Sequence, residues 1–480
     1  MSTARRIYKN TLYLGAAEIV SKVLQFVVML YAARLLSVEN FGKFSFAIAL
    51  SLIAIVLADL GIDSFIIREI SRNKNLAGEY FINALLAKLI LSLVTFLMIF
   101  VGLNALDYPQ DTRHIVYIIW MFSIISTFTD LFYSIFRSFE IMVYDSMIKI
   151  IRMILLTISS LYVLFKGYGV IAFSYTFVFV EIAVVLIALF IALKKFIKLQ
   201  IIIRWKFMKT MLLKALPFGL STVFGMIYFF IGSIMLSKIR GDVEVAIYSV
   251  AYNLALAILF IPTVYTNAIY PVLSRYFKQS KEELNILYEK SSKYLFIIGL
   301  PLSVGLYLLA DRIIFFFYGK TYSKSIIALQ IISWYLVIKF INFHFGTVLS
   351  SIDQQNKRMI GQGVTAVFSI ILNLLLIPKF GYAGAAWSTF FTEIFLFVIY
   401  YWYVSKNLYF YKFGDALSRP VIAAIAMSLF IKFTNFGLFL TVMLSAIIYI
   451  ALIFAMKTFD EKDFEIMRKI FKNEKIQSSR

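Results

Sequence analysis

Acidic and basic side chains interrupt the long apolar stretches of this chain, and they are the residues whose type and spacing can do chemistry. Glu18 stands four residues before Lys22, and Asp145 stands four residues before Lys149. On a helix, this spacing with the acid first favours an ion pair. A charge at the centre of a bilayer costs about 2.5–3.5 kcal/mol, so such a residue normally faces a cavity or a partner. Ion pairing and charge recognition are therefore the chemistry to expect.

Two sets of interior charges are candidates for a site. The cations are candidates to line a cavity, and they are Lys22, Lys88, Lys149, Arg152 and Lys214. The acids are candidates for charge balance or ion coupling, and they are Glu18, Asp59, Asp145, Glu181 and Glu393. A structural interpretation stays open for both sets. A self-neutralised pair helps a helix to insert, and a long basic side chain near a helix end can extend to the interface.

The stretches that carry these charges are long enough to cross a membrane. Hydrophobic residues make up 61% of the chain and charged residues 15%. A helix needs about 20 apolar residues to span a bilayer, and about fourteen stretches approach or exceed that length. Because lipid offers the backbone no hydrogen-bond partners, we expect helices throughout. The expected spans are residues 10–35, 42–67, 79–105, 113–136, 141–165, 169–193, 211–237, 245–272, 293–317, 325–351, 358–378, 382–404, 415–433 and 437–457.

The formal charge of +21 is placed mainly in the loops beside these spans. It does not form a basic groove with interleaved aromatic residues, which argues against nucleic-acid binding. If the N-terminus is cytoplasmic, about 30 Lys and Arg fall inside and about 10 outside. This bias predicts a multi-pass protein with both termini in the cytoplasm.

Cysteine is absent and only two histidines are present, His114 and His344. We therefore expect no disulfide, no thiolate nucleophile, no metal site and no cofactor. A lone histidine such as His344 is more often a packing residue than a ligand.

Two internal matches indicate a duplication. A shift of 204 residues lays Arg34 on Lys238, and a shift of 212 lays Gly169 on Gly381 and Glu181 on Glu393. Transporters are commonly built from such repeats. The expected organisation is a six-helix lobe over residues 1–196 and a second six-helix lobe with a basic linker over 197–406. Two further helices over 407–458 and an amphipathic cytoplasmic tail over 459–480 follow.

Several motifs resemble those of a known transporter family. Residues 34–44, Arg-Leu-Leu-Ser-Val-Glu-Asn-Phe-Gly-Lys-Phe, resemble the turn after the first helix of oligosaccharide flippases. Residues 58–62 with 68–70, 299–301, 317–322 and 373–386 resemble later parts of the same proteins. The similarity covers nearly the whole chain and is specific for the Wzx/RfbX type of the multidrug/oligosaccharidyl-lipid/polysaccharide exporter superfamily. The chain departs from many relatives at Gly232, where they place an Asp, so an ion-coupling role for that carboxylate is not carried over.

The resemblance implies a flippase of the cell membrane, and not an enzyme. Its expected substrate is a polyprenyl-(pyro)phosphate-linked oligosaccharide, moved from the cytoplasmic to the outer leaflet by alternating access for surface glycan biosynthesis. Interior cations would then compensate the pyrophosphate charge. Membrane lipids are expected partners, and an interaction with glycan polymerase or ligase machinery is left open.

Two alternatives stay open. The first is an ion-coupled small-molecule or multidrug antiporter on the same scaffold, which predicts an acidic lumen. The second is a membrane glycosyltransferase or polymerase, which usually needs a large extramembrane loop. Interior cations here are at least as numerous as interior acids, and the expected outside loops are short.

Overall fold

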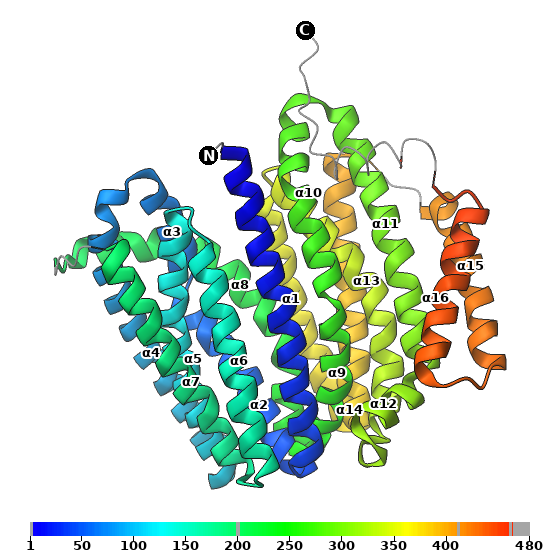
Figure 1. Ribbon diagram of the computed structural model, residues 1–480, viewed down its shortest axis with the longest axis horizontal. Coiled ribbons are helices and arrows are strands. Elements are labelled where there is room, and N and C mark those ends of the chain that lie inside the picture. The colour runs from blue at the N-terminus through cyan, green and yellow to red at the C-terminus, as the bar shows by residue number, and fades with distance from the viewer. Residues whose placement is uncertain (1–2, 198–201, 410–412, 460–462, 464–480) are drawn as a thin grey trace.

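The regular structure of the chain is helical. The computed structural model describes residues 3–197, 202–409, 413–459 and 463. Over these ranges the elements follow one another as helices joined by short turns (Figure 1). The fold class predicted from the sequence, an all-α polytopic membrane protein, is confirmed. The predicted amphipathic tail lies outside the described residues apart from residues 459 and 463.

The helices follow the expected spans, but the spans expected over 42–67, 245–272 and 293–317 are each divided into two helices, and α11 begins well before residue 293. The elements of the first half are α1 (Thr3–Leu35), α2 (Val38–Asp59), α3 (Ile62–Arg72), a short 3-10 turn (Lys74–Leu76), α4 (Ala77–Ala105), α5 (Gln110–Ser138), α6 (Val143–Phe165) and α7 (Gly169–Lys195). Those of the second half are α8 (Trp205–Arg240), α9 (Asp242–Ile258), α10 (Phe260–Gln279), α11 (Lys281–Leu308), α12 (Ala310–Tyr318), a second 3-10 turn (Lys320–Tyr322), α13 (Ser325–Ser351) and α14 (Gln355–Asn407). Two further helices end the described chain, α15 (Phe413–Phe433) and α16 (Leu438–Ala455).

Twelve segments of the described chain are long and apolar enough to cross a membrane. One of them is α14, whose 53 residues would form a rod of about 80 Å if straight. That length is far more than a hydrocarbon core of about 30 Å requires. The segment must therefore fold back on itself.

Gly381 is the point at which α14 folds back. Its φ of 55° and ψ of −131° belong to a region that only glycine enters readily. The rings of Phe368 and Phe395 lie 4.2 Å apart, although 27 residues of straight helix would separate them by about 40 Å. A Cβ at Gly361 would lie 2.9 Å from the Tyr400 ring. α14 is thus two antiparallel spans, as the separate sequence predictions for 358–378 and 382–404 require.

Two other spans bend without reversing. Leu60 (φ 45°) and Gly61 (φ 83°) break the helix between α2 and α3, and Leu259 separates α9 from α10. A Cβ at Gly219 of α8 would lie 2.3 Å from the carbonyl carbon of Leu60. The α2–α3 break therefore has the backbone of α8 packed directly against it.

Helix packing follows the same order in both halves of the chain. α1 packs on α6 as α8 packs on α14, and α2 packs on α5 as α9 packs on α13. α5 in turn packs on α7 as α13 packs on α14. Figure 1 shows α3–α7 on one side and α9–α16 on the other, with α1 between them, and α15 packs on α11 of the second half. This order agrees with a duplication, while the exact domain boundaries stay a prediction.

Candidate functional site

α5 ends and α6 begins at the upper end of Figure 1, and three charged side chains form a cluster at this junction. The Nε of Arg137 lies 2.6 Å from one carboxylate oxygen of Asp145, and the Nζ of Lys149 lies 3.1 Å from the other. Asp145 is fully buried, whereas the side chains of Arg137 and Lys149 are 34% and 24% exposed. The predicted pair of Asp145 and Lys149 is present. Because two cations share one carboxylate, these three groups by themselves carry one surplus positive charge, and the next acid that acts on Arg137 is Asp130 of α5.

Arg152 has a partner that sequence spacing did not reveal. Its Nε lies 2.8 Å from a carboxylate oxygen of Glu181, on α7, and the other oxygen of Glu181 accepts a 2.7 Å hydrogen bond from the Thr129 hydroxyl. The guanidinium also lies 5.6 Å from the centre of the Phe122 ring. Three helices, α5, α6 and α7, therefore meet at one ion pair that is neutral as a whole.

Lys88 is the centre of a third cluster in the first half. Its fully buried Nζ lies 2.9 Å from Asp59 and 2.8 Å from Asp63, and it donates a 2.9 Å hydrogen bond to the Thr127 carbonyl. Asp59 also accepts hydrogen bonds from the backbone N–H groups of Gly61 and Asp63, at 3.0 and 3.2 Å, and so caps α3. Two carboxylates share one ammonium here, so this cluster has the opposite balance, one surplus negative charge.

The second half contains a cluster around Glu393, the residue that the duplication lays on Glu181. The Nζ of Lys339 lies 3.2 Å from Glu393, and the Asn342 amide donates a 2.7 Å hydrogen bond to the other Glu393 oxygen. The Lys339 ammonium also donates to the Tyr228 hydroxyl and lies 4.1 Å from the centre of the Phe229 ring. The Lys339 ammonium therefore already has a carboxylate, a hydroxyl and an aromatic ring as partners.

Three predicted site residues lie outside these clusters. Glu18, Lys22 and Lys214 have exposed side chains on α1 and α8. The ion pair predicted for Glu18 and Lys22 does not form in the described structure, although Asp145 and Lys149 form one at the same spacing. Exposure lets the two long side chains of α1 extend away from each other, whereas burial of Asp145 holds its partners close. Lys22 and Lys214 are therefore open to a ligand, while Lys88 is enclosed.

Four residues of these clusters were not predicted as site residues. Arg137 completes the Asp145 cluster, Lys339 is the partner of Glu393, and Thr129 and Asn342 hold the two glutamates. Their signal in the sequence was a polar side chain inside an apolar span. The Nε2–H of the buried His344 donates a 3.1 Å hydrogen bond to the Tyr288 carbonyl, which agrees with its predicted packing role.

The two halves touch closely at the lower end of the molecule in Figure 1. Arg34, at the end of α1, donates a 2.5 Å hydrogen bond to the Phe316 carbonyl and another to the Phe317 carbonyl, in the last turn of α12. Lys238, which the duplication lays on Arg34, donates to the Leu106 carbonyl just after α4. Each half thus places a cation on the C-terminal end of a helix in the other half, where the helix dipole is negative.

Comparison with protein families gives two matches. Residues 7–277 match the family model described as "Polysaccharide biosynthesis protein", and residues 217–375 match the model described as "MatE". The chain is 25% identical over 420 residues to the capsular polysaccharide biosynthesis protein CapF of Staphylococcus aureus. That alignment covers 83% of this chain and 99% of the relative.

Comparison with solved structures gives the same fold. The lipid II flippase MurJ in an inward closed conformation matches with a TM-score of 0.78 and 16% identity, over 93% of this chain and 98% of that chain. An inward-facing multidrug resistance MATE transporter matches with a TM-score of 0.68 and 16% identity, over 81% and 94%. The matched proteins are a flippase and a transporter, as the sequence predicted, and not enzymes.

Proposed function

The chain belongs to the polysaccharide biosynthesis protein family, and from that premise we propose that it flips a polyprenyl-(pyro)phosphate-linked oligosaccharide from the cytoplasmic to the outer leaflet. Family membership makes it a transporter of the exporter superfamily and relates it to polysaccharide production. The lipid-linked substrate and the direction of movement are our proposal. The similarity to CapF and the flippase-like fold support it.

The observation that carries the proposal is the charge surplus of the Arg137–Asp145–Lys149 cluster. A pyrophosphate is a compact anion, and a partly exposed pair of cations that share one carboxylate retains the charge to attract it. The planar Arg137 guanidinium can bind two phosphate oxygens at once. We propose Arg137 and Lys149 as the first contacts of the headgroup, with Arg152, Lys22 and Lys214 as further cations on its path.

Lys88 has a different proposed role. Its ammonium is fully buried between Asp59 and Asp63, so a headgroup does not reach it in this conformation. We propose that the cluster of Lys88 sets the position of α3 against α4 and that the acids Asp59, Asp145, Glu181, Glu393 and Glu18 balance the interior cations.

The orientation also belongs to the proposal. From the positive-inside bias we propose that both termini face the cytoplasm, and with them the upper end of Figure 1, where α1 begins. The Arg137–Asp145–Lys149 cluster then lies near the leaflet from which the substrate is loaded. With a negative cytoplasm, each negative charge moved outward gains about 2.3 kcal/mol per 100 mV.

The test is flipping of a fluorescent polyprenyl-pyrophosphate oligosaccharide in proteoliposomes under an imposed potential. We expect Arg137→Gln and Lys149→Gln each to lower the initial rate by about tenfold or more, since each removes one charged hydrogen-bond donor worth about 1.5–3 kcal/mol. Lys22→Ala and Lys149→Ala/Arg152→Ala should also slow flipping. Lys166→Gln, at the opposite end of α6, is the matched control. Normal rates in folded Arg137 and Lys149 variants would contradict the site.

An ion-coupled small-molecule antiporter is the second candidate. The surplus negative charge of the Lys88–Asp59–Asp63 cluster and the match to the "MatE" model favour it. In the same vesicles, uptake of a cationic dye driven by a proton or sodium gradient, with no movement of the lipid, would favour this function over the flippase.

A further inference from the structure

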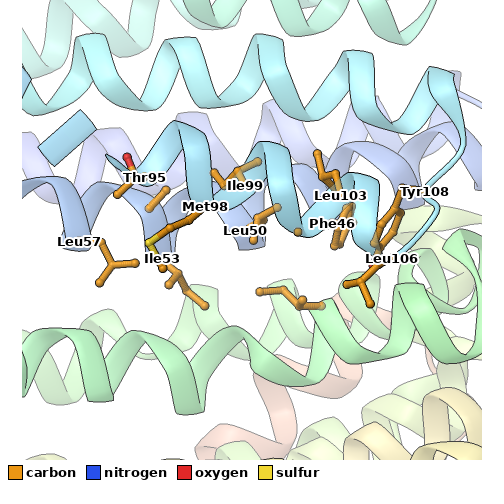
Figure 2. Close-up of a pocket in the computed structure, with 13 residues that line it drawn as sticks. Phe46, Leu50, Ile53, Leu57, Thr95, Met98, Ile99, Leu103, Leu106 and Tyr108 are labelled. Atoms are coloured by element: carbon orange, nitrogen blue, oxygen red, sulfur yellow. The ribbon is translucent and has the colours of Figure 1, made fainter. Parts of the chain in front are cut away.

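The two ends of the first half differ in their surface chemistry. Near the lower end, an apolar pocket of about 250 Å³ lies between α2 and α4, and Figure 2 shows Ile53 and Leu57 of α2 facing Met98 of α4. The hydroxyls that line this pocket belong to Thr95 and Tyr108, and the other lining side chains are apolar. The upper end of the same half is rich in charge instead.

Exposed cations surround the upper end of the first half, and we call them the basic surface. They lie at the end of α3, in the turn before α4, at the end of α7 and around the start of α8, and they are Arg68, Arg72, Lys74, Lys194, Lys195, Arg204, Lys206 and Lys209. The acids beside them are Glu69, Glu79 and Glu140. Deeper acids lie among the interior cations of the clusters described above, and they are Asp59, Asp63, Asp130, Asp145 and Glu181. Eight exposed cations beside three acids leave a surplus of five positive charges on this described surface.

The start of α8 lies at the surface end of a membrane span. α8 has 36 residues, which correspond to about 54 Å. Its apolar part, Gly219–Arg240, has 22 residues and is already long enough to cross a hydrocarbon core of about 30 Å. Figure 1 shows α8 beginning at the left, at the upper end of the first half, and running from there toward the centre of the molecule. The turns before Gly219 are therefore placed at the depth of the lipid headgroups.

The first turns of α8 are fixed to the first half by their buried face. Met208 and Met211 are buried, and the Phe207 ring lies 4.9 Å from the Tyr80 ring of α4. Just before the helix, the Asn83 side chain donates a 2.9 Å hydrogen bond to the carbonyl of residue 202 and accepts one of 3.1 Å from the N–H of residue 204. The exposed face of these turns therefore has a defined direction.

That exposed face combines apolar and cationic side chains. Trp205, Lys209 and Leu213 follow one another at intervals of four residues, so they share one strip of the helix. Trp205 is 66% exposed and Leu213 is 62% exposed. Lys206 lies exposed on the adjacent strip. An exposed tryptophan beside lysines is typical of a helix that lies in the interface of a bilayer.

We propose that the basic surface binds the headgroups of anionic phospholipids, with Trp205 and Leu213 among the first acyl carbons and Lys206 and Lys209 against the phosphates. Lipid headgroups are the molecules present at this depth, and the surplus of positive charge favours those with a net negative charge. An acidic protein would match the charge but would leave the flanking apolar side chains of the same strip without a partner. The inference goes beyond the proposed function, because it does not depend on the transported substrate.

The experiment measures lipid binding in the full chain without transport. Because the chain contains no cysteine, Thr210→Cys, at an exposed position between the cations, carries a single environment-sensitive fluorophore. The labelled protein in mild detergent is titrated with phosphatidylglycerol or with phosphatidylcholine of the same acyl chains. We expect half-saturation at a concentration about tenfold or more lower for phosphatidylglycerol. Raising the salt from about 0.1 M to about 1 M shortens the Debye length from about 10 Å to about 3 Å and should remove most of this preference.

Matched variants in the labelled background separate charge from apolar contact. Each lysine near an anionic surface contributes about fivefold in affinity. Lys206→Gln/Lys209→Gln should therefore raise the half-saturating concentration of phosphatidylglycerol by about tenfold or more and leave that of phosphatidylcholine unchanged. Trp205→Gln should weaken both lipids equally. Lys320→Gln/Lys324→Gln removes two exposed cations at the lower end and should change neither lipid.

The outcomes decide between the basic surface and a general charge effect. Equal half-saturation by the two lipids would overturn the proposal, and so would an equal loss of preference in the variants of the upper and lower ends. A response to inorganic phosphate as strong as that to phosphatidylglycerol would also overturn it, because the surface would then bind any anion. Flipping of the oligosaccharide lipid by wild type tests the proposed function separately, so either proposal can fail while the other stands.

Discussion

At the scale of residues, each charged cluster in the interior is defined by the acid that its cations contact. Glu181 and Glu393 occupy corresponding places, and each is held by a polar side chain from a corresponding helix, Thr129 of α5 or Asn342 of α13. Their cations nevertheless come from different helices, Arg152 of α6 and Lys339 of α13. The two halves thus keep a buried acid at the same place and neutralise it with a cation from a different helix.

Lys88 provides a prediction about stability. Lys88→Met leaves the partly buried Asp59 and Asp63 together without a cation, and breaking a buried pair in this way costs about 3–5 kcal/mol. We expect a clearly lower thermal unfolding midpoint in detergent. The triple variant Lys88→Met/Asp59→Asn/Asp63→Asn removes the charges together and should recover much of the loss, and the exposed Lys166→Met should have little effect. An unchanged midpoint for Lys88→Met would show that the cluster is not a structural element.

At the scale of elements, close backbone contacts decide how the helices pack. The α2–α3 break presents the Leu60 backbone to α8, and glycine at position 219 is what permits the approach. The fold of α14 likewise depends on Gly381, where a Cβ would lie 2.4 Å from the Glu244 carboxylate. Glu244, on α9, also accepts a 2.7 Å hydrogen bond from the Tyr382 N–H. This bond connects α9 to the point at which α14 folds back.

Gly219→Ala should separate α8 from the α2–α3 break. The added Cβ would lie 2.3–2.7 Å from backbone atoms of Leu60, which cannot rotate away as a side chain can. Overpacking typically costs about 1–3 kcal/mol, and a backbone contact places this site at the upper end. We expect less folded protein by size-exclusion chromatography and a lower unfolding midpoint. Gly305→Ala, where the new Cβ meets nothing within 4 Å, is the control. Equal behaviour of both variants would mean that α8 shifts freely.

At the scale of the whole molecule, the described conformation is closed at the lower end. Arg34 and Lys238 each bind carbonyls of the opposite half, and Tyr322 donates a 3.0 Å hydrogen bond to the Ala33 carbonyl. Near them α2 and α9 cross so closely that a Cβ at Gly42 would overlap the Asp242 backbone. The alternating access that we propose would require these contacts to break together when the molecule opens at this end.

Arg34→Gln and Lys238→Gln should each favour the form that is open at the lower end. The chain contains no cysteine, so a single Thr112→Cys reports accessibility without interference. Thr112 is fully buried and lies at the contact with Asp242. Each variant loses charged hydrogen bonds worth about 1.5–3 kcal/mol, so we expect labelling by a membrane-impermeant maleimide to rise by about tenfold or more. Lys379→Gln should leave labelling low. Labelling that stays low in both variants would show that these cations do not hold the end closed.

The sequence by itself determined the helical class and the approximate positions of the membrane spans, because the period and length of apolar residues depend only on local order and on bilayer thickness. It also predicted a break between the spans 358–378 and 382–404, where Gly381 lies, and the pair of Asp145 with Lys149, since both arise within one or two helical turns. Only the tertiary structure decided that Arg152 pairs with Glu181, that Lys88 is enclosed and that Lys22 is exposed. Those outcomes depend on which helices pack together, and the apolar faces that drive the packing are nearly interchangeable in sequence. Residual charge, and with it the candidate site, is therefore a property of the assembled helices.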